Sequence, residues 1–268
     1  MTPQTGTRYN IGRSTRLRTL KALLLPAVLG LGIVISPAAQ PPASAPATQT
    51  PVKPKPVALA DRWKSEMTAF DKENEMHPPR TGGLVFCGSS TIRLWKLKKS
   101  FPELAPVNRG FGGSRFDDLV VHAERILKPL QPAVLVVYSG DNDIAANQTT
   151  DEVYKNFEAF HAWVRKELPH TKVIVLGIKP SIKRWAMIES IRETNGRIAQ
   201  LCGKDPLSTF IDTETVMLGE NGQPIRDLYV EDGLHMSQAG YDRWAALLSP
   251  YLQTIHPATS AGSSPTKE

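Results

Sequence analysis

The sequence predicts an α/β fold in which helices cover both faces of a parallel sheet. Short apolar runs rich in Val, Ile and Leu alternate with longer segments that have amphipathic helical periodicity. Parallel strands need crossover connections, usually helical, and are buried on both faces, so they read as continuous apolar runs. Hydrophobic content of 41% and charged content of 22% fit a globular protein. We therefore expect one three-layer α/β/α domain around five strands.

Five apolar runs are the expected strands. The first, third and fourth are rich in Val, Leu and Ile, the second is short, and glycine or proline flanks most of the runs, as is typical of buried strands. The fifth is weaker because four of its six residues are Ser, Thr or Asp. The runs lie at residues 83–88, 105–111, 132–140, 171–178 and 208–213.

Amphipathic segments between and around these runs are the expected helices. The segment 151–168 is typical, since Val153, Phe157, Phe160 and Val164 recur at helical spacing on one face. The last segment begins at Ser237, a residue type that caps helix N-termini. The expected helices cover residues 60–76, 116–130, 151–168, 185–202 and 237–253.

Residues 1–39 have the layout of a secretory signal peptide. Five basic residues and no acidic residue precede the apolar run 22–35, and small residues follow that run. The run is short for a membrane span and contains Pro26. An uncleaved N-terminal anchor is the alternative. We expect an exported protein, periplasmic or secreted, with no stable membrane insertion after the signal is cleaved.

The rest of the chain is expected to form one domain between an extended, semi-rigid linker and a disordered tail. Residues 40–60 are a Pro- and Ala-rich linker, 61–256 the folded domain, and 257–268 a disordered tail. The formal net charge is +6, of which the basic N-terminal segment supplies +5. The remaining +1 gives no phosphate-neutralising surface, so we expect no nucleic-acid binding. The oligomeric state is not readable from the sequence.

Cys87 and Cys202 are the two cysteines of the chain. Export permits a disulfide between them. However, one ends an apolar strand and the other ends a helical segment, so two buried free thiols are the preferred expectation. Two cysteines cannot form a structural zinc site, and no metal is expected.

Four polar clusters follow the expected strands or lie in a late loop. They are Gly88-Ser89-Ser90, "NRGFGGSR" at 108–115, "SGDND" at 139–143 and "DGLH" at 232–235. The carboxyl ends of parallel strands share one edge of the sheet, where ligands of such folds bind. Each cluster also has a simpler interpretation: a helix cap, a glycine turn, an Asx-rich turn and a surface turn. The second cluster is no dinucleotide fingerprint, because Arg115 stands where its last glycine belongs.

Together the clusters fit acyl transfer by an activated serine. A serine hydroxyl needs a base, histidine is the usual one near neutral pH, and a carboxylate fixes the imidazole tautomer. His235 alone among the six histidines has an aspartate, Asp232, at this spacing in an expected strand-end loop. The oxyanion needs converging donors, for which Gly113 N–H and the Asn142 amide are the candidates.

The same residues resemble the SGNH hydrolases, also called GDSL-type esterases and lipases. "FCGSSTIRLW" is similar to the first block of that family, "NRGFGGS" to the second, "GDND" to the third and "DGLH" to the fifth. The resemblance covers about 82–250 and implies a flavodoxin-like three-layer sandwich. It also implies roles: Ser90, Asp232 and His235 as the catalytic triad, and Ser90, Gly113 and Asn142 as the oxyanion hole.

One departure from the family pattern concerns Ser89, which stands where the family usually has Asp before the nucleophile. Ser90 is preferred as nucleophile because it aligns with the family position and opens the turn into the next helix. The expected enzyme is a serine ester hydrolase that forms an acyl-enzyme and needs no metal or organic cofactor. The lipase elbow G-x-S-x-G is absent from the chain, which argues against the α/β-hydrolase fold.

The substrate is expected to be a small-molecule or carbohydrate ester with a short acyl or acetyl group. Lys183, Arg184 and Trp185 follow the fourth strand, so they are candidate substrate contacts, with Trp95 as an aromatic wall. Packing of Trp185 against the domain is the simpler interpretation of that residue. Two other functions stay open: an O-acyltransferase acting on a sugar, and a non-catalytic exported binding module of the same fold.

Overall fold

A computed structural model describes residues 59–255 of the chain. The expected signal peptide, residues 1–39, most of the expected linker and the expected C-terminal tail lie outside the described residues. Within 59–255, no helix is long and apolar enough to cross a membrane.

The five expected strands form one all-parallel sheet, which confirms the predicted fold class. Their order is β2-β1-β3-β4-β5, so the chain starts inside the sheet, adds β2 at one edge and then winds the other way. β1 pairs with both β2 and β3, and Gly88 at its end lies opposite Gly110 and Tyr138. The strands are β1 (Leu84–Gly88), β2 (Val107–Gly110), β3 (Val134–Tyr138), β4 (Lys172–Leu176) and β5 (Ser208–Ile211).

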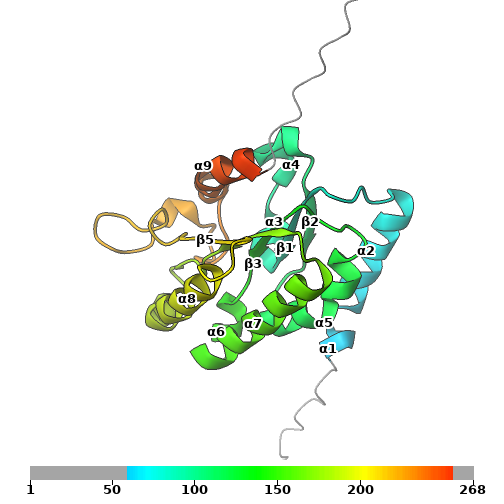
Figure 1. Cartoon of the computed structure of the whole chain (residues 1–268). Coiled ribbons are helices and arrows are strands. Elements are labelled where there is room, and N and C mark those ends of the chain that lie inside the picture. The colour runs from blue at the N-terminus through cyan, green and yellow to red at the C-terminus, as the bar shows by residue number, and fades with distance from the viewer. Residues whose placement is uncertain (1–58, 256–268) are drawn as a thin grey trace, which may run out of the picture. The chain divides into compact units, whose positions relative to one another are not determined.

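Helices cover the two faces of this sheet, as Figure 1 shows. In β3, Leu135 and Val137 pack toward one face, while Val134, Val136 and Tyr138 pack toward the other. This alternation puts an apolar layer on each side of a strand buried at every position. The first face carries α2 (Lys64–Met76), α5 (Phe116–Leu127), α7 (Thr150–Glu167) and α8 (Ile188–Cys202); the second carries α3 (Ser90–Leu94), α4 (Leu97–Ser100) and α9 (Gln238–Ile255).

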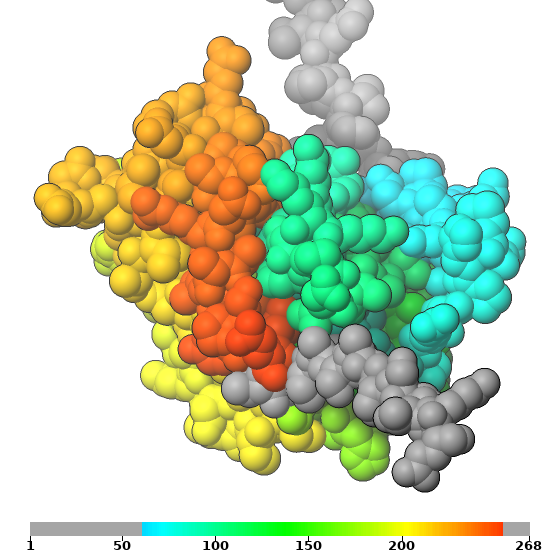
Figure 2. Space-filling view, turned by 90° about the horizontal axis from the view of Figure 1, so that it is seen from above, coloured from blue at the N-terminus to red at the C-terminus, as the bar shows by residue number. Residues whose placement is uncertain are grey.

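The face that carries α9 brings together two segments far apart in the sequence. Figure 2 shows the orange-red α9 beside the blue-green segment around residues 90–104, and α4 contacts α9. Tyr241 of α9 donates from its hydroxyl to the carbonyl oxygen of Thr91 in α3 at 2.9 Å. The helix that carries Ser90 is therefore held in place by a helix that is distant from it in the sequence.

Some element boundaries differ from the predicted ones. The first expected helix is divided into α1 (Leu59–Arg62) and α2, because the helical hydrogen bonding is interrupted at Trp63. The ring of Trp63 is buried and packs edge-on against Phe111, with ring centroids 5.4 Å apart. The helix expected from Trp185 starts as a 3-10 turn, η2 (Trp185–Met187). The remaining short elements are α6 (Asp141–Ala145), η1 (Pro102–Leu104) and η3 (Arg226–Leu228).

Two smaller expectations are confirmed. Ser237 Oγ accepts a hydrogen bond from Gly240 N–H at 3.4 Å, so it caps α9. Cys87 and Cys202 are free and buried. Burial raises the pKa of the Cys87 thiol well above its usual range and that of Cys202 to about 12. Neither thiol is therefore ionised near neutral pH.

Candidate active site

Ser90 and Ser89 have different environments at the end of β1. Ser89 is fully buried, and no described residue accepts from or donates to its hydroxyl. Ser89 is the N-cap residue of α3, and its carbonyl oxygen accepts from the N–H groups of Ile92 at 3.0 Å and Arg93 at 3.1 Å. Ser90 begins α3 and is partly exposed. Only the Ser90 hydroxyl can therefore reach a substrate.

A histidine and an aspartate reach Ser90 from the loop before α9. His235 Nε2 lies 3.1 Å from Ser90 Oγ, and His235 Nδ1 lies 2.6 Å from Asp232 Oδ2. With Nδ1–H donating to the carboxylate, Nε2 carries the lone pair that faces the serine hydroxyl. The structure thus brings together the three residues expected as a triad, in the geometry that general-base activation of a serine requires.

The Asp232 carboxylate is held by its own loop. Its Oδ1 accepts from the N–H groups of Leu234 at 2.8 Å and His235 at 2.9 Å. Although partial burial acts to raise the pKa of Asp232, these two hydrogen bonds and the His235 ring lower it to about 2. The group is therefore a carboxylate across the neutral range and can stabilise an imidazolium.

The loop owes its shape to Gly233 and to contacts with the segment after β4. Gly233 has φ +66°, a left-handed conformation that glycine adopts without strain. Its carbonyl oxygen accepts from Lys183 N–H at 3.0 Å, and Val230 N–H donates to the His235 carbonyl at 2.9 Å. The imidazole is thus carried on a tight turn fixed on both sides.

Gly113 lies in the loop that follows β2. This loop folds back onto the end of β1, because Phe111 N–H and Ser114 Oγ both donate to the Gly88 carbonyl, at 2.9 and 3.2 Å. Gly113 has φ +82°, and no acceptor for its N–H lies among residues 59–255. Its amide is therefore available, as is that of Ser90, which stands in the first turn of a helix where N–H groups have no intrahelical partner.

Asn142 comes to the same loop from the end of β3. Its Nδ2 donates to the carbonyl oxygen of Ser114 at 3.0 Å, next in sequence to Gly113. An amide nitrogen has two hydrogens, so one stays available for a ligand. Gly113 and Asn142 are thus joined through Ser114, a residue whose part in the site the sequence analysis did not identify.

The three residues after β4 that were expected to contact substrate lie in different environments. Arg184 donates from NH2 to Asn142 Oδ1 at 3.0 Å and forms an ion pair with Asp141 at 2.8 Å. Trp185 is partly buried and packs against the core, the simpler interpretation of that residue. Lys183 is exposed, and its backbone holds Gly233.

Trp95 corrects the expectation of an aromatic pocket wall. It is 3% exposed and packs in the core against Phe86 and Phe101, with ring centroids 5.5 and 5.7 Å away. Its Nε1–H donates to Ser100 Oγ at 2.9 Å. The chain ends α3 at Leu94, and this turn sends the indole inward, so Trp95 does not line the cavity that borders His235.

The last aspartate of "GDND" holds the neighbouring helix. Asp143 is fully buried, and its Oδ1 accepts from Phe116 N–H, the first residue of α5, at 2.9 Å. Burial raises the pKa of Asp143 to about 7, with the Phe116 hydrogen bond opposing the rise. This side chain fixes the start of α5 and does not face the triad.

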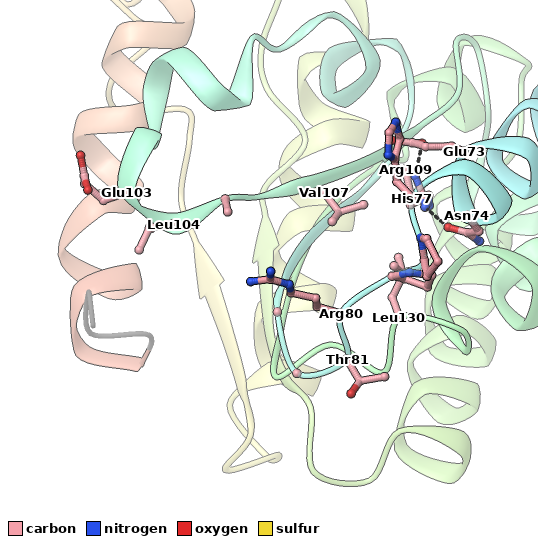
Figure 3. Close-up of a pocket in the computed structure, with 15 residues that line it drawn as sticks. Glu73, Asn74, His77, Arg80, Thr81, Glu103, Leu104, Val107, Arg109 and Leu130 are labelled. Atoms are coloured by element: carbon pink, nitrogen blue, oxygen red, sulfur yellow. Dashed lines mark hydrogen bonds and ion pairs between the residues drawn. The ribbon is translucent and has the colours of Figure 1, made fainter. Parts of the chain in front are cut away.

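Two of the cavities in the described structure differ in their relation to the triad. One of about 370 Å³ borders His235, and its other lining residues are Leu94, Lys96, Val230, Met236, Ser237, Gln238 and Tyr241. Leu94 and Val230 are 41% and 43% exposed, which makes this an open apolar surface beside the triad. The other, about 480 Å³, lies at the amino ends of β1 and β2 (Figure 3), where Arg109 bonds to Glu73. No triad residue lines that second cavity.

Among residues 59–255, no group of three or more His, Cys, Asp or Glu side chains is placed to hold a metal ion. The polar groups described above are one hydroxyl, one imidazole, one carboxylate, backbone amides and one side-chain amide. Such a set can move a proton and stabilise an oxyanion.

The comparisons with known proteins identify the family. The profile of the GDSL-like Lipase/Acylhydrolase family matches residues 93–243. The chain belongs to this family. The GDSL-like acylhydrolase described here is an enzyme that acts on esters. The match begins just after Ser90 and includes Gly113, Asn142, Asp232 and His235.

Individual relatives agree with the family assignment. The acylhydrolase is 29% identical over 203 residues to platelet-activating factor acetylhydrolase IB subunit alpha1 of Rattus norvegicus, covering 70% of this chain and 83% of the relative. A solved Streptococcus pneumoniae structure, named after platelet activating factor, matches with TM-score 0.65 and 24% identity over 72% of this chain and 94% of that one. An acetyl-xylooligosaccharide esterase of Geobacillus stearothermophilus matches with TM-score 0.53 and 18% identity, covering 66% and 95%. The two structural matches support the fold alone.

Proposed function

We propose that this GDSL-like acylhydrolase is an exported serine esterase that removes short acyl groups, acetyl above all, through a Ser90–His235–Asp232 triad. The observation that carries the proposal is the 3.1 Å approach of His235 Nε2 to Ser90 Oγ, with Asp232 on the other ring nitrogen. Export rests on the N-terminal sequence, and the proposed domain limits stay as expected from the sequence, with the hydrolase domain at 61–256.

In the first step, Ser90 Oγ attacks the ester carbonyl carbon as His235 Nε2 takes the hydroxyl proton. The imidazolium that forms is stabilised by the ionised Asp232, 2.6 Å from Nδ1. The tetrahedral intermediate collapses when the C–O bond to the alcohol breaks and His235 returns the proton to the leaving oxygen. The products are an acyl-Ser90 ester and the free alcohol.

Three donors would stabilise the oxyanion of this intermediate: the N–H groups of Ser90 and Gly113 and the second hydrogen of Asn142 Nδ2. Their loops are fixed by hydrogen bonds from Phe111 and Ser114 to Gly88 and from Asn142 to Ser114. Donors held in place before the reaction need no reorganisation as charge develops, which is why such groups contribute strongly to rate.

In the second step, water attacks the acyl-enzyme. His235 takes a proton from the water, and the new C–O bond forms as the ester bond to Ser90 breaks. The proton passes to Ser90 Oγ, so the triad is restored and the carboxylic acid is released. Every proton is carried by His235, and no further group is required.

The preference for a short acyl group rests on the relatives. The Rattus norvegicus relative is an acetylhydrolase by name, and the Geobacillus stearothermophilus neighbour is an acetyl-xylooligosaccharide esterase. The open surface formed by Leu94 and Val230 beside His235 would receive the alcohol part of the ester. We propose an acetylated small molecule or carbohydrate as the substrate class.

The test measures hydrolysis of p-nitrophenyl esters by the purified full chain, with acyl groups of two to ten carbons. Ser90→Ala is the control. The expected result is turnover that falls as the acyl chain lengthens and is lost in Ser90→Ala. A folded wild-type chain with no turnover between pH 6 and 9 would support a binding module instead. Product analysis with a sugar acceptor separates hydrolysis from acyl transfer, because transfer yields an acylated sugar in place of free acid.

A further inference from the structure

We propose that Arg184, supported by Asp141 and Lys179, is a positioning residue that orients the Asn142 amide toward the oxyanion. This inference rests on the proposed function, since it assigns a task within the same site. The four side chains follow two neighbouring strands, β3 and β4, and Asn142 connects them to the loop that carries Gly113 through its bond to the Ser114 carbonyl.

The partners of Asn142 permit one orientation of its amide. Arg184 carries only donors, so its bond of 3.0 Å requires the amide oxygen. The Ser114 carbonyl can only accept, so its bond of 3.0 Å requires the amide nitrogen. A flip of the amide would place donor against donor and acceptor against acceptor. The two contacts together direct Nδ2 toward the loop of Gly113.

Arg184 is itself held on its other side. Its NH1 lies 2.8 Å from Asp141 Oδ2, and the same carboxylate oxygen lies 3.5 Å from Lys179 Nζ. Lys179 also donates to the Tyr138 hydroxyl at 3.3 Å. Burying charged groups is costly unless they are paired, and Lys179 and Asp141 are both almost completely buried. The planar guanidinium bridges a carboxylate and an amide oxygen, which a single ammonium does less well.

The cluster also sets the local electrostatics. It places the guanidinium of Arg184, which is always charged, directly behind the Asn142 amide, with Asp141 as its ion-pair partner. Donation to Oδ1 polarises the amide and strengthens the remaining Nδ2–H as a donor. Both effects favour a negative oxygen in front of the amide, in the tetrahedral intermediate more than in the neutral ester.

The first test is a double-mutant cycle on p-nitrophenyl acetate with Arg184→Met, Asn142→Ala and both together. We expect Arg184→Met to lower kcat by about 10- to 100-fold, with little change in KM. This loss is smaller than the roughly 10²- to 10³-fold loss in kcat that follows removal of an oxyanion donor. In the Asn142→Ala background the same change should cost less than about twofold, because Arg184 acts through that amide. A full loss in both backgrounds would overturn the proposal.

Two variants keep a general structural effect apart from positioning. Arg192→Met removes an arginine of α8 that pairs with Glu189 and Glu214, neither of them a residue of the site, and should leave kcat unchanged. Arg184→Lys keeps the charge and should restore part of the lost kcat; no recovery in a folded Arg184→Lys variant, or an equal loss in Arg192→Met, would contradict the proposal.

The second test does not depend on turnover. The Asn142 side-chain amide resonances, identified by their loss in Asn142→Ala, should shift in Arg184→Met and keep their positions in Arg192→Met. Unchanged resonances in Arg184→Met would show that Arg184 does not orient the amide. If the wild-type chain lacks Ser90-dependent turnover, the proposed function fails, and this measurement still decides whether Arg184 orients Asn142.

Discussion

His235 Nε2 lies 3.1 Å from Ser90 Oγ, although the two residues are 145 positions apart in the sequence. α9 secures this approach, because it follows the His235 loop and Tyr241 bonds to the Thr91 carbonyl in α3. The neighbouring Ser89 hydroxyl is buried and has no partner among the described residues. The structure therefore separates two adjacent serines by their access to the imidazole.

Covalent labelling should distinguish these serines. Ser90→Ala is expected to abolish labelling by a fluorophosphonate probe, since the nucleophile is gone. Ser89→Ala should be labelled like the wild type, because the removed hydroxyl has no partner among the described residues. Gel fluorescence of the labelled chain gives the readout, with thermal unfolding to verify that both variants fold. Loss of labelling in Ser89→Ala alone would move the nucleophile by one residue.

Asp232→Asn should lower kcat on the order of 10³- to 10⁴-fold while the fold persists. An amide cannot hold the imidazole in the tautomer that leaves Nε2 free, nor stabilise the imidazolium. Because the pKa of Asp232 is about 2, the carboxylate stays ionised throughout the usual assay range. Steady-state kinetics at pH 5 to 9 measure the effect. A loss of less than tenfold at every pH would rule out this role for Asp232.

Asp143→Asn should change how stability depends on pH. Burial raises the pKa of Asp143 to about 7, so between pH 4 and 7 the folded chain binds a proton that the unfolded chain has released. The stabilising contribution of that proton is complete below pH 4 and lost as the pH rises through 7. Relative to the wild type, Asp143→Asn should therefore gain stability over this window, by up to roughly 4 kcal/mol.

Urea unfolding at pH 4, 5.5, 7 and 8.5 would measure this difference. Asparagine keeps an oxygen for Phe116 N–H and does not titrate, so any fixed cost of the new amide group is the same at each pH. A difference between the two proteins that is constant from pH 4 to 8.5 would contradict the raised pKa.

Two glycine-to-alanine changes should have opposite effects. Gly88 has φ +140°, and a Cβ there would lie 1.8 Å from the Tyr138 carbonyl oxygen, so Gly88→Ala should cost more than about 3 kcal/mol or prevent folding. Gly196 is in the middle of α8 with open space around it, and Gly196→Ala should add about 0.5–1 kcal/mol. Chemical denaturation measures both. A Gly88→Ala variant as stable as the wild type would show that β1 and β3 do not meet as described.

Strand composition predicted the fold because parallel strands buried on both faces have a distinctive apolar sequence. It also predicted which polar clusters share an edge, since that follows from strand direction alone. The direction in which individual side chains point was harder to predict from the sequence. Trp95 lies five residues after Ser90, yet the chain turns at the end of α3 and places the indole in the core. Nothing in the local sequence indicates that turn.

Arg184 was expected at the strand-end edge as a substrate contact, and the structure adds Asn142 and Asp141 as its partners there. The segment after β4 does reach the triad edge, as its position in the chain predicted. Its role depends on Asp141, which follows the neighbouring strand β3. The basic residues Lys179 and Arg184 follow β4, and the acidic residue Asp141 follows β3. Had the strand order been predicted as well, these opposite charges would have been expected to pair. Ser114 left no such signal, because its backbone carbonyl is the group that bonds to Asn142.

The segment 179–184 has a practical consequence for altering the substrate range of this enzyme. It contacts both halves of the site, through Lys183 N–H on Gly233 and through Arg184 on Asn142. A change of length there would shift base and oxyanion donor at once, so libraries should leave this segment untouched. The side chains of Leu94 and Val230 are exposed beside His235. These two positions can therefore be varied without displacing the triad or the oxyanion donors.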